Sequence, residues 1–277
     1  MKIRDFVLDP KSSATDFYLS KWCKPGARYL VYRSLVFCYW CVAFIVDLCN
    51  NLDGGWFFIY LSHWGESLVL LYFFTALCTS ICGYLQTRRE REKISSILKI
   101  ALHSREEIKE NETENVKNRS LKLKWFHYLT TILFIASFNV SITVTILYPI
   151  LDDVTYHSAS FLSINIHILN FILMLIDLCV NGINVKFQQF FISVITSAMY
   201  AATLVTLHLT GANSAVYPAI DYKQNPIRTS LVTVAMILIA PVLCHSVMYC
   251  IYRLKLCIGY RIRRRTRTSV PVMAGNK

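Results

Sequence analysis

Ser62 and His167 are the two residues of this sequence whose types best fit nucleophilic chemistry. A neutral imidazole can take the proton of a serine hydroxyl, which then attacks the carbonyl carbon of an ester. Ser62 lies in the segment Tyr-Leu-Ser-His-Trp just before one apolar stretch, and His167 lies inside another. Serine and histidine at such places also cap helices or bond to neighbouring helices, and no G-x-S-x-G motif surrounds Ser62. The pair is a candidate catalytic dyad, with structural hydrogen bonding as the alternative.

His167 also belongs to a stripe of polar residues on one predicted helix. At about 100° per residue, the polar positions of residues 160–181 fall within about 100° of arc. These positions are Ser160, Ser163, His167, Asn170, Asp177 and Asn181. The other positions are mainly apolar, so the polar face is expected to point into a helical bundle. The stripe is the candidate lining of a functional cavity.

Asp177 is the member of this stripe that most needs a partner. A carboxylate in hydrocarbon costs about 2.5 kcal/mol or more unless it is paired or protonated. Counted from the helix ends, Asp177 lies near the depth of His245 on the last apolar segment and of Arg33 on the first. Either residue could pair with it. Such a pair would fix helix packing or take part in proton transfer, because both kinds of site perturb charge states.

The ten cysteines do not form a pattern typical of metal binding. Cys38 and Cys41 have C-x-x-C spacing, but no second pair of ligands lies nearby in the sequence. Most of the others lie within apolar segments, where cysteine is expected to be a small packing residue. No metal and no cofactor are therefore expected. Cys23 and Cys257 flank the apolar segments and are candidate acylation sites.

All these side chains lie on or beside segments that are apolar enough to span a membrane. With 55% apolar and 17% charged residues in 277, the chain has too little polar surface for a soluble globular protein. A bilayer core about 30 Å thick needs about 20 mostly apolar residues per spanning helix. Six segments qualify: 29–47, 67–85, 125–148, 160–181, 188–209 and 229–252. The sequence predicts an all-α, polytopic membrane helical bundle with six transmembrane helices.

The distribution of Lys and Arg predicts the orientation of this bundle. Residues 1–28, 86–124 and 253–277 together with Lys186 hold 26 of the 29 Lys and Arg residues, whereas the opposite segments hold only Lys223 and Arg228. Because cytosolic segments carry the excess of cations, both termini are expected to be cytosolic. This bias also explains the net charge of +12 without nucleic-acid binding. The arginine cluster that begins at Arg261 is a candidate contact for anionic lipid headgroups.

The segment 86–124 is the main cytosolic insert, and its structure is open between two alternatives. Apolar residues recur at helical spacing in its first half, between Ile94 and Leu102. They predict either an amphipathic helix on the inner leaflet or a cytosolic extension of the second transmembrane helix.

Several local patterns resemble those of rolling stone-like membrane proteins. They are Tyr60-Leu-Ser-His-Trp-Gly65, His167-Ile-Leu-Asn170, Met174-Leu-Ile-Asp177, and Tyr217-Pro-Ala-Ile-Asp-Tyr222 followed by Asn225-Pro226. The resemblance covers nearly all of the membrane region. It implies an integral membrane protein with a role in cell adhesion or cell fusion, since the type member of the family is associated with myoblast fusion in insects.

A more distant resemblance connects the chain to the androgen-induced family of intramembrane threonine hydrolases. These enzymes cleave fatty acid esters of hydroxy fatty acids with a Thr and a His. By local pattern, Ser62 stands at the Thr and His167 at the His, ten residues before Asp177. The resemblance implies a lipid-ester substrate, although Ser replaces Thr.

Three functional interpretations follow. The first is a rolling stone-like protein of adhesion or fusion that contacts a membrane-protein partner. The second is a lipid-ester hydrolase with the dyad Ser62 and His167, supported by Asn170 or Asp177. The third is a small transporter or channel that uses the polar stripe, but the expected internal repeat is not evident. Each places the chain in the plasma membrane or the endoplasmic reticulum, in contact with membrane lipids.

Overall fold

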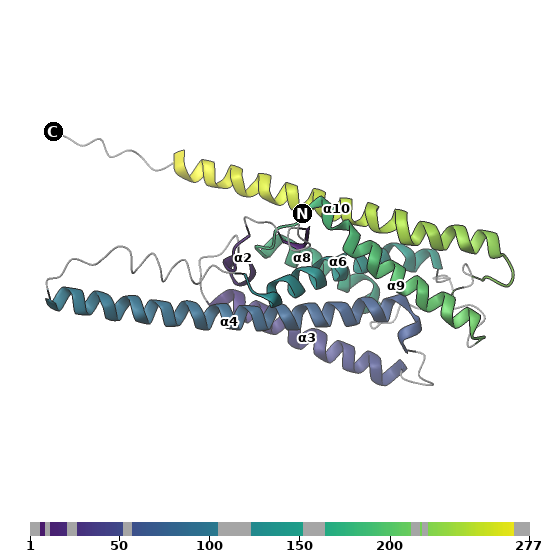
Figure 1. The fold of residues 1–277 in the computed structure, drawn as a ribbon, viewed down its shortest axis with the longest axis horizontal. Coiled ribbons are helices and arrows are strands. Elements are labelled where there is room, and N and C mark those ends of the chain that lie inside the picture. Colours follow the sequence, from purple (N-terminus) through teal and green to yellow (C-terminus); the bar gives the residue numbers. More distant parts are fainter. Residues whose placement is uncertain are drawn as a thin grey trace.

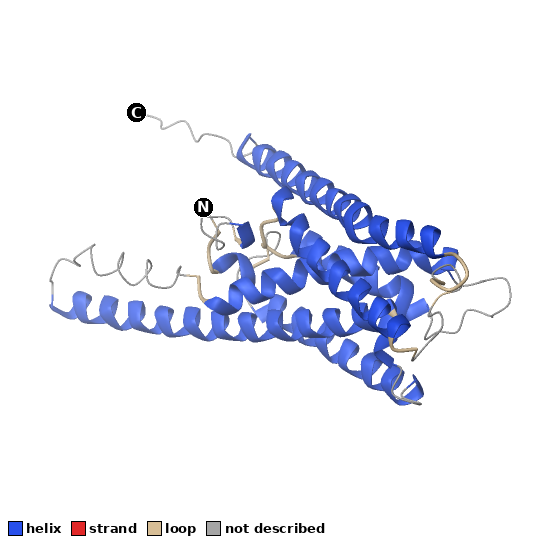
Figure 2. Cartoon of the chain, turned by 45° about the vertical axis from the view of Figure 1, so that its right-hand side comes forward, coloured by secondary structure: helices blue, strands red, loops and turns tan. Residues whose placement is uncertain are grey.

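The computed structural model describes residues 6–8, 12–20, 27–51, 57–104, 123–151, 164–211, 217 and 221–268. Within these ranges the regular secondary structure is helical (Figure 2). The elements are α2 (Thr15–Tyr18), α3 (Ala27–Asn51), η2 (Phe57–Ile59), α4 (Leu61–Ser104), α6 (Trp125–Leu151), η3 (Asn165–Leu169), α8 (Asn170–Val180), η4 (Phe187–Gln189), α9 (Phe190–Leu209) and α10 (Pro226–Thr268).

Five of the described helices are long and apolar enough to cross a membrane. They contain the spans Ala27–Asn51, Leu61–Ser96, Trp125–Leu147, Phe187–Leu209 and Pro226–Ile262. The predicted segment 160–181 corresponds to a shorter apolar helix, Asn165–Val180, and its first residues lie outside the described ranges. The predicted all-α, polytopic membrane bundle is confirmed.

α6 lies in the middle of the bundle, with the other helices around it (Figure 1). In α6, 67% of the apolar span is buried, compared with 22–39% in the other four spans. The outer helices direct large apolar residues outward, for example Leu35 on α3 (66% exposed) and Leu243 on α10 (61% exposed). Such a surface is stable in lipid rather than in water.

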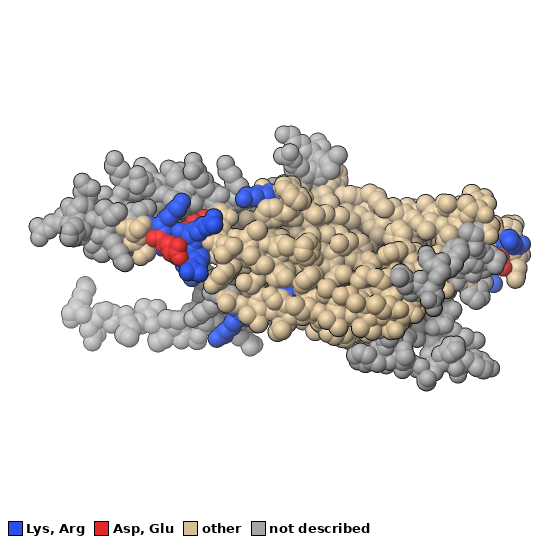
Figure 3. All heavy atoms as spheres, turned by 90° about the horizontal axis from the view of Figure 1, so that it is seen from below, with Lys and Arg blue, Asp and Glu red and all other residues tan. Residues whose placement is uncertain are grey.

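The charged side chains lie mainly at one end of the molecule. In the space-filling view, Lys and Arg gather beside a broad band with almost no charged atoms, and a few more charged atoms mark the opposite end (Figure 3). α4 and α10 both project beyond the bundle at the more basic end (Figure 1). We call this the inner end and the opposite one the outer end, following the predicted orientation.

α4 is one continuous helix from Leu61 to Ser104. It begins six residues before the predicted start at residue 67 and continues into the insert, so its described part is an extension of the second span. The early start makes Ser62, His63 and Glu66 helical rather than loop residues.

The segment before α3 packs against the inner end of the bundle. The Gln189 side-chain amide donates to the carbonyl of Val7 (2.6 Å), and the Lys186 ammonium donates to that of Leu8 (3.1 Å). Phe17 on α2 is buried and its ring contacts the ring of His127 at 4.7 Å. Gly182 lies so close that an added Cβ would be 2.4 Å from the carbonyl oxygen of Asp16. Glycine at position 182 therefore permits this close backbone approach.

Candidate functional site

A buried ion pair joins the first and fourth apolar segments in the middle of the bundle. Arg33 Nη1 on α3 lies 2.9 Å from Asp177 Oδ1 on α8, and both side chains are 0% exposed. Of the two partners expected for Asp177, Arg33 is the one that pairs with it. Burying either charge alone in a low-dielectric interior would cost roughly several kcal/mol, even after the protein relaxes around it. The pairing of the two charges offsets this cost.

Three tyrosines complete the environment of this pair. Arg33 Nε and Nη1 donate to the hydroxyls of Tyr29 and Tyr72, both at 3.1 Å. Tyr32 donates to Asp177 Oδ1 at 3.2 Å, and Tyr72 donates to Asp177 Oδ2. The sequence did not single out these tyrosines, because a phenol in an apolar segment has the same pattern as a lipid-facing or interfacial aromatic residue.

His245, the other expected partner of Asp177, bonds elsewhere. It is fully buried, and its Nε2 lies 2.9 Å from the carbonyl oxygen of Lys186. Since a carbonyl only accepts, Nε2 carries the proton and Nδ1 accepts from the side-chain amide of Asn139 (3.4 Å). His245 therefore joins α10, α6 and the turn after α8 instead of joining the ion pair.

A buried lysine caps the C-terminus of α8. Lys255 on α10 is 5% exposed, and its ammonium donates to the carbonyls of Leu178 (2.6 Å) and Asn181 (2.5 Å). A cation at this position satisfies terminal carbonyls and interacts favourably with the helix dipole. The sequence assigned Lys255 only to the basic tail.

The polar stripe is regular in its second half and displaced in its first half. Asn170, Asp177 and Asn181 are each 0% exposed, and Asn181 Nδ2 donates to Asp177 Oδ2 at 3.1 Å. Before Asn170 the chain forms a π-helical turn, Asn165–Leu169, which holds more residues per turn than an α-helix. The turn buries Asn165 and leaves His167 half-buried, so the assumed 100° spacing fails there.

The candidate dyad is divided between α4 and this π-helical turn. Ser62 lies in the first turn of α4 and is half-buried, like His167. Within the described residues, no hydrogen bond joins the Ser62 hydroxyl to the His167 ring. The carbonyl of His167 accepts a bond from Thr145 Oγ1 at 2.5 Å, which fixes this turn against α6. Ser163 lies outside the described residues.

A second group of buried ionisable side chains lies at the outer ends of α3 and α4. His63 Nδ1 is 2.7 Å from Asp47 Oδ2, and Glu66 is 0% exposed beside them. The ring of Phe57 stacks on the ring of His63 at 4.0 Å. Sequence analysis did not identify this group, because residues 48–66 lie between the predicted segments 29–47 and 67–85 and were expected to form an outer loop. The i, i+3 spacing of His63 and Glu66 would have indicated a shared helix face.

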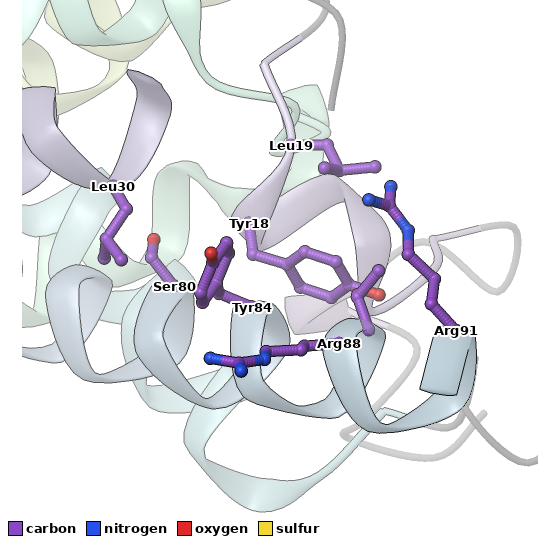
Figure 4. A pocket seen from close by; sticks show the side chains of 8 residues that line it. Tyr18, Leu19, Leu30, Ser80, Tyr84, Arg88 and Arg91 are labelled. Carbon is purple, nitrogen blue, oxygen red and sulfur yellow. The ribbon is translucent and has the colours of Figure 1, made fainter. Parts of the chain in front are cut away.

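Two of the described cavities open at the inner end: one of about 730 Å³ between the segment after α8 and α10, and one between α2 and α4. The volume of the cavity between α2 and α4 is about 110 Å³, and the side chains of Tyr18, Tyr84, Arg88 and Arg91 surround it (Figure 4). Another, of about 20 Å³, lies between α4, α6, α9 and α10, and both polar residues such as Asn139 and apolar ones such as Leu61 line it. This last cavity is large enough for about one water molecule. The transporter interpretation thus stays a prediction.

The cysteines lie mostly on the lipid-facing surface. Of the described cysteines only Cys244 is buried, so the expected packing role is wrong for most of them. Cys257 is exposed at the inner end, and Cys23 lies outside the described residues. Acylation at these two positions stays a prediction.

Comparisons with known proteins give the family. The family model of protein rolling stone matches residues 10–265, which is most of the chain. The chain belongs to the rolling stone family. It is 25% identical to protein rolling stone of Drosophila melanogaster over 249 residues, which cover 86% of this chain and 82% of that protein. No solved structure matches the chain.

The patterns that carry the rolling stone resemblance stabilise the outer end of the bundle. The Trp64 indole donates to the carbonyl of Phe58 (2.7 Å). The backbone N–H of Leu61 lies in the first turn of α4, where N–H groups have no partner within the helix, and it donates to the hydroxyl of Tyr217 (3.2 Å). The hydroxyls of Tyr222 and Thr233 bond at 2.7 Å. Burial raises the pKa of the Tyr217 hydroxyl, so it stays protonated at neutral pH. Much of the family signature is thus explained by packing.

Proposed function

We propose that this rolling stone family member acts in cell adhesion or cell fusion at the plasma membrane, with its outer end as the contact surface. The observation that carries the proposal is the family match over nearly the whole bundle. It is supported by two exposed aromatic residues at the outer end, Phe58 (53% exposed) and Tyr60 (40% exposed). Aromatic side chains are enriched in the centres of protein interfaces.

The underlying bundle suits such a role because it is rigid where the contact surface is anchored. The ring of Tyr60 packs against the rings of His63 and Tyr217 at 5.9 and 6.2 Å. An aromatic residue held in place loses little conformational entropy when a partner binds. The same residues would equally serve as interfacial anchors in the bilayer, which the experiment below separates from partner binding.

The test mixes two differently labelled populations of non-adhesive cells that express the protein. Wild type is expected to raise the number of mixed aggregates or multinucleate cells, and Phe58→Ala/Tyr60→Ala to lower it at equal surface level by biotinylation. Tyr260→Ala, which removes an exposed aromatic residue (69%) from the inner end, is the matched control. A wild type no better than empty cells, or an outer variant equal to wild type, contradicts the proposal. Loss of surface level alone indicates a membrane anchor.

A specific observation favours a second candidate, the lipid-ester hydrolase with Ser62 and His167. His167 lies in a π-helical turn inside an apolar segment, and such turns are frequent at functional sites. Both residues are half-buried, so part of each side chain stays accessible from the lipid side. In this proposal Ser62 is the nucleophile, His167 the base, and Asn170 or Asp177 supports the polar environment.

A fluorophosphonate probe tests the hydrolase on the purified full-length protein. Labelling that is lost in Ser62→Ala and in His167→Ala, together with turnover of fatty acid esters, supports it. Ser67→Ala is the control, because Ser67 lies on the same helix and donates to the carbonyl of His63 (2.7 Å). Wild type without labelling and without ester turnover rejects the hydrolase and leaves the adhesion proposal unchanged.

A further inference from the structure

Asp47, His63 and Glu66 bring three ligand-type side chains together at the outer ends of α3 and α4. One carboxylate oxygen of each acid and one nitrogen of the imidazole lie within 4.8 Å of one another. The two acids are 0% exposed and His63 is 8% exposed. His63 and Glu66 are one helical turn apart, a spacing that places histidine and glutamate side by side at metal sites in helical bundles.

Glu66 is buried beside a second acid, with no N–H donor to compensate it. Neither of its carboxylate oxygens accepts a hydrogen bond from an N–H group, and the side chain interacts with the carboxyl group of Asp47. Burying an ionised carboxylate in such a place costs roughly several kcal/mol of stability unless a cation or a proton compensates its charge. Among the described residues, no Lys or Arg forms an ion pair with Glu66 or Asp47. Two carboxylates face one imidazole, so the group lacks positive charge even when His63 is protonated.

The surroundings orient these side chains toward one another. Asn51 Nδ2 donates to Asp47 Oδ1 at 2.7 Å, which leaves Asp47 Oδ2 directed at His63 Nδ1 (2.7 Å). The stacked ring of Phe57 covers His63 and is itself 2% exposed. Bonds that orient a ligand carboxylate and an apolar cover that limits solvent access are both features of metal centres.

We propose that Asp47, His63 and Glu66 bind a divalent transition-metal ion, with Zn²⁺ as the best match. An imidazole favours zinc over magnesium or calcium, and carboxylate oxygens complete a set of three protein ligands. Zinc bound by three protein ligands keeps one position for water or another ligand. The sequence-based expectation of no metal rested on the cysteines, which take no part here.

This site shares no residue with the candidate dyad or with the exposed aromatic pair, and its His63 ring packs against one member of that pair, Tyr60, at 5.9 Å. Its position ties the outer end of α3 to that of α4. A bound ion would therefore hold these two helices together next to the segment that connects them. Part of that segment, residues 52–56, lies outside the described residues.

The test measures the metal content of full-length protein purified in detergent, equilibrated with Zn²⁺ and desalted. Wild type is expected to retain about one zinc per chain, the capacity of a single three-ligand site. Glu66→Gln and Asp47→Asn keep the side-chain shape and are expected to lower the affinity by more than about tenfold, since even an outer-shell change costs that much. His208→Gln, which removes a half-buried imidazole near the outer end of α9, is the matched control and should retain the zinc.

Thermal unfolding with and without Zn²⁺ separates metal binding from a folding defect. Zinc should raise the unfolding temperature of wild type and of the control but not of Glu66→Gln. Wild type that retains no zinc, or Glu66→Gln that retains as much as wild type, overturns the proposal. If wild type binds no metal and Glu66→Gln is the more stable protein, the two acids instead share a proton.

Discussion

At the scale of single residues, the Arg33–Asp177 pair is the polar centre of the bundle. Sequence depth reduced the partners of Asp177 to Arg33 and His245, and the structure pairs it with Arg33 at 2.9 Å. The sequence does not decide which of the two pairs with Asp177. Both residues lie at similar depth, and only the rotation of each helix about its axis determines which one faces Asp177. The surrounding tyrosines were missed for a related reason: their hydroxyls have a role only once that rotation is known.

Replacing one member of this pair should destabilise the protein strongly. Asp177→Asn leaves a buried guanidinium without its counter-ion, and we expect the free energy of unfolding in detergent to fall by about 3–5 kcal/mol. Arg33→Met combined with Asp177→Asn should recover part of the loss, because it removes the unpaired charge. The control is Leu35→Ala, on the same helix but 66% exposed. Equal unfolding curves for Asp177→Asn and Leu35→Ala would show that the ion pair contributes little.

At the scale of elements, the apolar segments were predicted well and their ends were not. α4 begins at Leu61 rather than at residue 67, and this shift alone concealed the group around His63. The π-helical turn Asn165–Leu169 was also not predictable, since an inserted residue changes no apolar count but rotates every side chain before it. Asn165 is buried and accepts a hydrogen bond from Tyr39 for this reason.

The close packing between Gly182 and α2 gives a prediction at the same scale. An alanine Cβ at position 182 would lie 2.4 Å from the carbonyl oxygen and 2.9 Å from the Cα of Asp16, and backbone atoms cannot yield as a flexible side chain can. Gly182→Ala should therefore release residues 12–20 from the bundle. Amide hydrogen exchange in that segment should rise several-fold. Ile176→Val, a lipid-facing change on α8, should leave it unaltered, and unchanged exchange in Gly182→Ala would refute the packing argument.

At the scale of the whole molecule, the charge distribution is the basis for the predicted orientation. The basic ends of α4 and α10 project from the same end of the bundle (Figure 1). An even number of crossings with such ends requires both termini on one side. The number of spans was harder to predict, because the apolar helix Asn165–Val180 is shorter than the other five.

Epitope tags fused to residues 1 and 277 test this orientation in sealed membrane vesicles. We expect protease added to the cytosolic side to remove both tags, and a tag inserted after Gly211 at the outer end to be cut only when detergent is present. Gly211 suits the insertion because its φ is 69° and no atom would meet an added Cβ within 4 Å. Tags on opposite sides of the vesicle would disprove the six-crossing arrangement.

The length of α4 and α10 has a mechanical consequence. At about 1.5 Å per residue, the part of α4 after residue 85 is about 28 Å long, and the part of α10 after residue 252 is about 24 Å long. Both parts continue helices that are packed in the bundle, so they are stiff extensions rather than flexible linkers. A cytosolic protein bound to the ends of both extensions would be held roughly 24–28 Å from the lipid headgroups. A force that this protein applied to the two helix ends would be transmitted along α4 and α10 to α6, against which both helices pack.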